Sequence, residues 1–186
     1  FESISPEACG IRFVNKVDNT EDFNIFSYRN FYNGGGVAIG DVNNDGLADV
    51  YLTSNMGDNQ LYLNKGNFQF ENITEKAGVA GAKFWSTGVV MVDINADGFD
   101  DVIIGALIAG VGSQPGAAFI VYGKAAGLTF IDLGTEGLVS SGQGFVIAGD
   151  ASTRFMGSST APAGDVNGDG IDDLLVGNGD KAVVVF

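Results

Sequence analysis

The sequence predicts an all-β fold that is built of short antiparallel strands in repeated four-stranded units. Three observations support this class. The chain has 29 glycines and 3 prolines, and its 45% hydrophobic residues fall in short runs, which is typical of many strands joined by tight turns. No apolar run approaches the ~18 residues of a membrane-spanning helix. The same order of strand-like runs also surrounds three copies of one acidic nonapeptide.

The four runs of each unit are short and rich in β-branched and aromatic residues. The first runs, which precede the acidic peptide, are residues 36–40, 88–92 and 159–164. The second runs, which follow it, are 50–53, 102–105 and 174–177, and the third are 60–63, 118–122 and 182–186. A fourth run is recognised at 68–73 and 128–133. The second unit is longer, and its excess is predicted at 107–116 and 134–157.

The third unit has no fourth run before the chain reaches Phe186. Residues 1–5 (Phe-Glu-Ser-Ile-Ser) closely match residues 70–74 (Phe-Glu-Asn-Ile-Thr), so the N-terminal strand is predicted to complete the last unit. An all-β β-propeller manages its sheet edges by such radial repetition. The sequence therefore predicts one domain, residues 1–186, with three four-stranded antiparallel blades at 34–73, 86–133, and 157–186 plus 1–5.

Each acidic peptide reads D-x-N-x-D-G-x-x-D, at residues 41–49, 93–101 and 165–173. Oxygen donors at positions 1, 3, 5 and 9 around a glycine turn suit a hard cation, and calcium accepts six to eight oxygens in flexible geometry. About three Ca²⁺ per chain are expected, with the carbonyl of position 7 as a further ligand. The predicted ligands are Asp41, Asn43, Asp45, Leu47 and Asp49; Asp93, Asn95, Asp97, Phe99 and Asp101; and Asp165, Asn167, Asp169, Ile171 and Asp173.

An EF-hand is excluded, because position 12 is Leu52, Ile104 or Val176 where that loop needs a glutamate. The alternative is a metal-free Asp/Asn/Gly hairpin turn. Three carboxylates within nine residues would repel one another unless a cation lay between them, which favours the metal site. Asp100 and Asp172 are expected to face solvent, since the first loop has alanine at that position.

Composition excludes several functions. Histidine is absent, which removes Ser-His-Asp and Cys-His chemistry and histidine metal sites, so no enzyme is expected. The formal charge of −14 argues against nucleic acid and anionic membranes as partners, and three Ca²⁺ would cancel about six of these charges. The single Cys9 cannot form an internal disulfide. A carboxylate pair for glycoside hydrolysis is not excluded by composition.

Two further segments are candidates for binding. Residues 10–33 carry six aromatic side chains and could bind carbohydrate, but packing against a blade is the favoured interpretation, as it is for Trp85. The run 105–116 is apolar for a surface loop and is either a partner contact or a connection.

The repeats resemble the FG-GAP/VCBS family of integrin-α-type calcium-binding propeller blades. Residues 34–64 and 70–78 are more similar to the cartilage-acidic-protein (ASPIC/UnbV) branch, and residues 122–124, 144–149 and 163–173 to the haemolysin-type and integrin-like branch. In that family the aspartates and asparagine of the loop bind calcium between the first two strands of a blade. The resemblance implies the same role for all three loops here.

The resemblance further implies a non-enzymatic module for extracellular adhesion or for binding a protein or glycan, with structural calcium. One alternative is a carbohydrate-associated propeller of a polysaccharide-processing enzyme. Another is a self-assembling fragment, chimeric or engineered. Because propellers usually have four to eight blades, three blades predict either a homodimer with a six-bladed ring or part of a larger propeller. An extracellular, periplasmic or cell-surface location is expected, because millimolar calcium suits weak all-oxygen loops.

Overall fold

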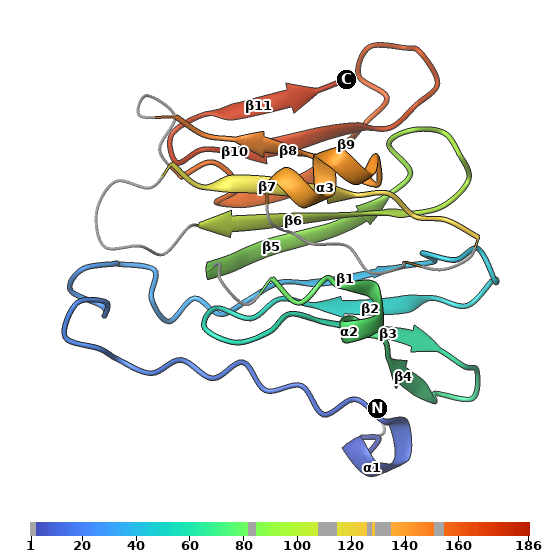
Figure 1. Ribbon diagram of the computed structural model, residues 1–186, viewed down its shortest axis with the longest axis horizontal. Helices are drawn as coiled ribbons and strands as arrows, with labels where there is room; N and C mark the ends of the chain where they lie inside the picture. Colours follow the sequence, from blue (N-terminus) through green and yellow to red (C-terminus); the bar gives the residue numbers. More distant parts are fainter. Residues whose placement is uncertain (1–2, 82–84, 108–114, 126–127, 129–134, 151–154) are drawn as a thin grey trace.

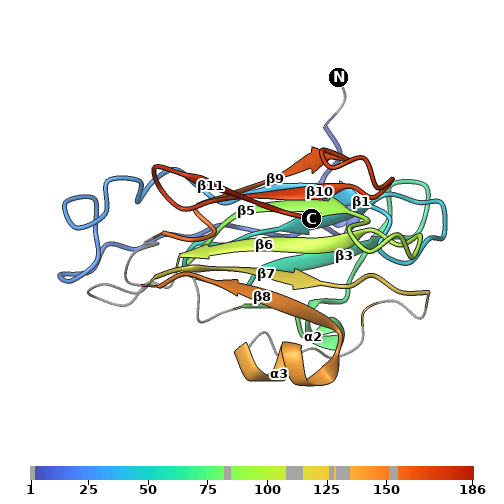
Figure 2. The same ribbon diagram turned by 90° about the horizontal axis from the view of Figure 1, so that it is seen from above.

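Three antiparallel sheets lie side by side in the order of the chain (Figure 1). The computed structural model describes residues 3–81, 85–107, 115–125, 128, 135–150 and 155–186. The first strands of the sheets are neighbours: β5 (Trp85–Val92) packs between β1 (Val37–Gly40) and β9 (Ser159–Gly164). Figure 2 shows these strands at one side of the molecule and β8 and α3 at the other. The all-β class with antiparallel sheets is therefore confirmed.

The first sheet has the order β1-β2-β3-β4 and falls within the predicted unit 34–73. Its other strands are β2 (Asp49–Leu52), β3 (Gln60–Asn64) and β4 (Phe70–Asn72). Val50 and Tyr51 give β2 the β-branched and aromatic side chains that favour a pleated, half-buried strand. The register pairs Ala38 with Tyr51 and Tyr51 with Leu61, so these three side chains share one face, where all are buried.

The second sheet has the order β5-β6-β7-β8, with β6 (Asp101–Leu107), β7 (Ala117–Val121) and β8 (Gly144–Ala148). Its fourth strand among the described residues is β8, which pairs with β7, whereas the sequence predicts a fourth strand at 128–133. Residues 129–134 lie outside the described part of the chain. Gly144–Ala148 contains Phe145, Val146 and Ile147, a run with the same strand signal as 128–133, so local sequence alone could not separate the two candidates.

The third sheet has the order β11-β10-β9, with β10 (Asp173–Gly177) and β11 (Ala182–Val185). The predicted fourth strand from residues 1–5 is not seen in the described residues. Residues 3–5 form no strand and lead into α1 (Pro6–Cys9) beside the first sheet, where the Gln69 amide donates to the carbonyl of Ala8. Phe1 and Glu2 lie outside the described residues. A closed ring is likewise not seen, and closure remains a prediction.

The described part of the chain has three helices, which are short and lie at the sheet margins. They are α1, α2 (Thr74–Ala77) and α3 (Thr135–Ser141). Ser5 caps α1 by accepting the N–H of Ala8 at 3.2 Å. Gly10 ends this helix at φ +86°, and a Cβ there would lie 2.5 Å from the carbonyl oxygen of Phe70. A glycine is therefore required at this position, where the N-terminal segment passes close to β4.

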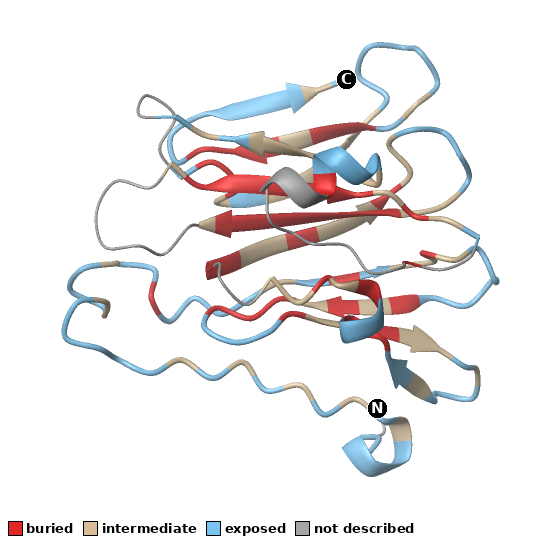
Figure 3. Ribbon diagram, in the orientation of Figure 1, coloured by how far each residue is buried: buried red, intermediate tan, exposed pale blue. Residues whose placement is uncertain are grey.

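Two apolar clusters fill the spaces between neighbouring sheets. One joins the first and second sheets and includes Tyr51, Leu61 and Ile104. The other joins the second and third sheets and includes Ile103 and Leu174. Because Ile103 and Ile104 alternate along β6, the central sheet is buried on both faces (Figure 3). Sheets packed face to face in this way hold the loops at their ends in fixed positions.

Candidate metal-binding loops

The three acidic peptides are the hairpin loops that join the first and second strands of each sheet. They connect β1 to β2, β5 to β6, and β9 to β10, and all three lie at the same edge of the molecule (Figure 1). The strand that leads into each loop is fixed by its sheet, so the loop begins and ends at defined backbone positions. The sequence repeat is therefore a repeat in space.

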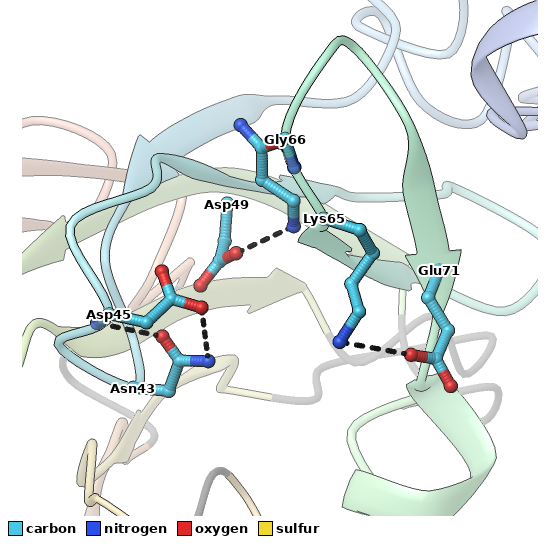
Figure 4. Close-up of polar contacts among 7 residues, drawn as sticks. Asn43, Asp45, Asp49, Lys65, Gly66 and Glu71 are labelled. Atoms are coloured by element: carbon cyan, nitrogen blue, oxygen red, sulfur yellow. Dashed lines mark hydrogen bonds and ion pairs between the residues drawn. The ribbon is translucent and has the colours of Figure 1, made fainter.

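In the first loop, carboxylate and amide oxygens accept hydrogen bonds from the backbone of the loop itself. Asp41 accepts the N–H of Asp45 at 3.1 Å through one oxygen and the N–H of Gly46 at 2.8 Å through the other. The Asn43 side-chain oxygen also accepts the N–H of Asp45, at 3.2 Å (Figure 4). Asp45 in turn accepts the N–H of Leu47 at 2.9 Å. These bonds fold the loop so that the side chains at positions 1, 3 and 5 turn inward.

The other two loops repeat this pattern. Asp93 accepts the N–H groups of Asp97 (3.2 Å) and Gly98 (2.8 Å), and Asp165 accepts those of Asp169 (3.0 Å) and Gly170 (2.8 Å). The position-5 bonds recur at 2.9 Å to Phe99 and at 2.8 Å to Ile171. The glycine of position 6 has φ of +83°, +88° and +88° in the three loops, a conformation that only glycine adopts readily.

The ninth-position aspartates are buried beneath their loops. Asp49 accepts the N–H of Val42 at 3.2 Å and that of Asn64 at 2.9 Å. Asp101 accepts the N–H of Ile94 at 3.1 Å and that of Gly123 at 2.8 Å, and Asp173 accepts the N–H of Val166 at 2.8 Å. Each of these carboxylates thus links its loop to the interior of its own sheet.

Burial raises the pKa of two of these carboxyls well above the ordinary value of 3.8. Desolvation is the largest cause, and it raises the pKa of Asp49 to about 6 and that of Asp101 to about 7. The two backbone hydrogen bonds to each carboxylate act in the opposite direction. The other loop carboxylates, Asp45 and Asp41 for Asp49, raise the pKa further by repulsion. The loops therefore concentrate negative charge that a cation would neutralise.

The donor set of each loop fits a hard divalent cation. Each offers three carboxylates and one amide oxygen, and a carboxylate oxygen that accepts one hydrogen bond retains a second lone pair. The two salt bridges found among the described residues, Lys16–Asp18 and Lys65–Glu71, involve no loop carboxylate. In the same part of the chain, no three His, Cys, Asp or Glu side chains are grouped closely enough to hold a metal ion. The ligand assignments, including the position-7 carbonyls, therefore remain predictions.

Asp100 does not face solvent as expected. Its carboxylate accepts the backbone N–H of Asp41 at 2.8 Å, and its own N–H points to the carbonyl of Asp41 at 3.4 Å. A second backbone hydrogen bond reaches the first loop: the N–H of Lys124 donates to the carbonyl of Val42 at 3.3 Å. The corresponding Asp172 of the third loop is exposed, as predicted. The first two loops are thus joined across the boundary between two sheets.

Comparison with known proteins identifies the repeats. Residues 41–104 match the FG-GAP-like repeat, and residues 156–186 match the FG-GAP repeat. The chain belongs to the FG-GAP repeat family. The matched residues include all three acidic loops. The assignment made from the loop motif and the repeated strands is thereby confirmed.

Individual relatives of this FG-GAP chain include integrin α subunits. Integrin alpha-PS5 of Drosophila melanogaster is 31% identical over 166 residues, which cover 83% of this chain and 16% of the relative. Integrin alpha-2 of Bos taurus is 30% identical over 149 residues (74% and 12%), and cartilage acidic protein 1 of Xenopus tropicalis is 35% identical over 77 residues (41% and 12%). The chain thus spans less than a fifth of the length of these relatives.

The aromatic segment of the FG-GAP chain packs against the second sheet. Phe31 is fully buried, and its ring lies 5.2 Å from that of Trp85 at the start of β5. Phe23 and Tyr28 contact Trp85 edge-on, with ring centroids 4.8 and 5.7 Å away. The predicted packing role is confirmed for these rings. Beside them lies a cavity of about 230 Å³ lined by Tyr28, Asn30, Asn33, Gly34, Gly35, Gly36, Trp85, Thr87, Gly88 and Ser158.

The apolar run 105–116 and Cys9 do not take part in the acidic loops described above. Of the apolar run 105–116, residues 108–114 lie outside the described part of the chain. Cys9 is a free, half-buried thiol at the end of α1. None of the described helices has the length and apolar character needed to cross a bilayer.

Proposed function

We propose that this chain is a non-enzymatic, calcium-binding β-propeller module for extracellular adhesion or for interaction with a protein or glycan. The observation that carries the proposal is the buried ninth-position aspartate, which lies beneath an all-oxygen loop in each of the three sheets. A buried carboxylate is costly unless it is paired with a cation. Calcium would supply that cation.

In this proposal each ion is structural. The side chains of positions 1, 3, 5 and 9 and the carbonyl of position 7 would hold it, which gives about three Ca²⁺ per chain. Bound calcium would join the first two strands of a sheet through the buried aspartate and would offset the repulsion among the loop carboxylates. The three sheets would then be blades of a propeller.

The extracellular setting rests on the relatives and on the metal. Two of the relatives described above are integrin α subunits. Their family supports a role in adhesion at the cell surface. Weak all-oxygen loops also suit the millimolar calcium found outside cells. The chain has no histidine to serve as a general base near neutral pH, which favours binding over catalysis.

Calcium stoichiometry tests the metal part of this proposal. Isothermal titration and elemental analysis after gel filtration should give three ions per wild-type chain. Asp45→Asn removes one carboxylate from the first loop and should leave two tightly bound ions. Asp58→Asn makes the same charge change at an exposed site outside the loops, so it should retain three. A wild-type chain that binds no calcium at millimolar concentration would overturn the proposal.

A glycan array and a panel of extracellular-matrix proteins test the binding part. Calcium-dependent binding without turnover supports an adhesion or interaction module. Turnover of a bound polysaccharide would instead support the carbohydrate-processing alternative and would contradict the non-enzymatic assignment.

A further inference from the structure

A side chain of the second acidic loop occupies the space that a glycine leaves open at the end of β1. The carboxylate oxygen of Asp100 that accepts the N–H of Asp41 lies where a side chain at position 40 would begin. A Cβ placed on Gly40 would lie 2.6 Å from that oxygen, a separation too short for a real side chain. The bond between the two loops therefore requires a glycine immediately before Asp41.

Backbone hydrogen bonds join the buried ninth-position carboxylates of the same two loops by a second route. Asp101 of the second loop accepts the N–H of Gly123 at 2.8 Å, and the next N–H along the chain, that of Lys124, donates to the carbonyl of Val42 at 3.3 Å. The N–H of Val42 in turn donates to Asp49 at 3.2 Å. The carboxylates beneath the two loops are thus connected by hydrogen bonds and the short backbone segments between them.

The junction between the second and third sheets differs at the position of the glycine. Val92 immediately precedes the second loop, as Gly40 precedes the first, and its side chain lies where an approaching carboxylate would have to enter. Asp172, the counterpart of Asp100, is exposed. Among the residues that the structure describes, no hydrogen bond joins Asp172 to Asp93. The bond from the eighth position of a loop therefore distinguishes the first pair of loops from the second pair.

Both connections end on parts of the first loop that carry its predicted calcium ligands. Asp100 holds the backbone of Asp41, the first ligand, and Val42 links the second route to Asp49, the ninth. An ordered second loop fixes the position of Asp100, so the first loop loses less conformational freedom when its own ion binds. The negative charge of Asp100 at the contact also offsets the repulsion between two divalent ions.

We propose that Asp100 is a positioning residue that couples the first and second calcium sites, so that an ion in either loop raises the affinity of the other. This inference rests on the calcium binding proposed above. Linkage requires the coupling to be equal in both directions. Because coupling between sites typically changes an affinity by about 5- to 150-fold, the expected effect is about fivefold or more.

Calcium titrations followed by amide NMR spectra measure each loop separately. Gly46, Gly98 and Gly170 place one backbone N–H in each loop, donated to the first predicted ligand of that loop. Asp97→Asn weakens the second loop and should lower the calcium affinity of the first loop, measured at Gly46, by about fivefold or more. Asp169→Asn makes the same change in the third loop and should lower that affinity by less than about twofold, as for independent sites.

Variants of Asp100 show whether this residue carries the coupling. Asp100→Ala should lower the calcium affinity of the first loop, and in this background Asp97→Asn should have little additional effect at Gly46. Asp100→Asn retains an oxygen that can accept the N–H of Asp41 and should restore most of the coupling. Asp172→Ala removes the corresponding exposed carboxylate and should behave as the wild-type chain does.

The titrations separate a failure of the coupling from a failure of calcium binding. If the three glycine amides respond to calcium but Asp97→Asn leaves the midpoint at Gly46 unchanged, the coupling is overturned and calcium binding stands. If none of the amides responds, both proposals are overturned. The dispersion of each spectrum identifies a chain that has failed to fold. Should Asp97→Asn fail to fold, equal midpoints at Gly46 in Asp100→Ala and Asp172→Ala would overturn the coupling.

Discussion

The carboxylate of Asp100, in the loop between β5 and β6, accepts the backbone N–H of Asp41 at the start of the loop between β1 and β2, at 2.8 Å. The two residues are 59 positions apart in the sequence and belong to different sheets. The bond ties the first two acidic loops together and satisfies a backbone donor at the point where the first loop leaves its strand. The coupling between these loops therefore depends on a residue outside the predicted ligand set.

Replacing Asp100 with alanine should destabilise the chain by about 1.5–3 kcal/mol, the usual contribution of a hydrogen bond to a charged group. Asp172→Ala is the matched control, because it removes the same charge at the corresponding position of the third loop, where the side chain is exposed. Its effect should stay within about 0.5 kcal/mol. Urea unfolding in saturating calcium measures both changes, and equal effects would contradict a special role for Asp100.

Removing calcium should lower the melting temperature. Ligand that binds only the folded chain stabilises it by about 2.7 kcal/mol per site at a concentration of 100 Kd. Calorimetry in EDTA and in millimolar calcium measures the difference, and magnesium in place of calcium provides a control for ionic strength. The same melting temperature in EDTA and in calcium, with no calcium bound to the chain, would contradict a structural role for the ion.

In EDTA, stability should increase as the pH falls from about 7 towards 4. The pKa values of Asp49 and Asp101 in the folded chain, about 6 and about 7, lie above the ordinary value of 3.8. At pH 7 Asp49 is mostly charged and Asp101 is about half charged, and these buried charges oppose folding, so protonation at lower pH relieves this cost. In calcium the dependence should reverse, because protons displace the ion. Melting curves at several pH values measure this dependence. Asp49→Asn should reduce the change of stability with pH in EDTA, because one of the two buried carboxylates is then absent.

Phe31→Ala should destabilise the chain by about 3–5 kcal/mol, since it removes a fully buried ring that contacts Trp85. Phe26→Ala makes the same chemical change in the same segment, but Phe26 is 98% exposed, so its effect should be within about 0.5 kcal/mol. Tryptophan fluorescence during unfolding follows both variants. If the two behave alike, the aromatic segment does not contribute to the core.

Much of the fold could be predicted, because the acidic loops mark the same point in each repeat. Once the loops were aligned, the strands on either side followed from short β-branched runs, and β1 to β3 lie within a residue of their predicted bounds. The fourth strand of the second sheet could not be chosen, since 128–133 and Gly144–Ala148 have similar patterns and the choice depends on long-range pairing with β7. Chain proximity likewise brought residues 3–9 to the first sheet instead of the third.

The candidate site, like the fold, could be predicted from the sequence only in part. The loop turns, with glycine at positive φ and inward oxygen donors, could be predicted from nine residues, because each bond forms within the loop. The burial of Asp49 beneath its loop and the contact from Asp100 could not, since both depend on residues brought together by the folded sheets. The sequence predicts a solvent-facing Asp100 only because the first loop has alanine, Ala48, at the corresponding position.

The spacing of the loops constrains how this chain can change in length. Each acidic loop spans eight residues, 41–48, 93–100 and 165–172, because the ligand positions and the buried aspartate fix that number. Two connections between the second and third strands, 53–59 and 178–181, lie at the other end of these strands and differ in length by three residues. We therefore expect insertions to be tolerated in the connections between the second and third strands and not in the acidic loops. A foreign epitope or a new recognition loop would be best grafted between β10 and β11, where it would leave every acidic loop intact.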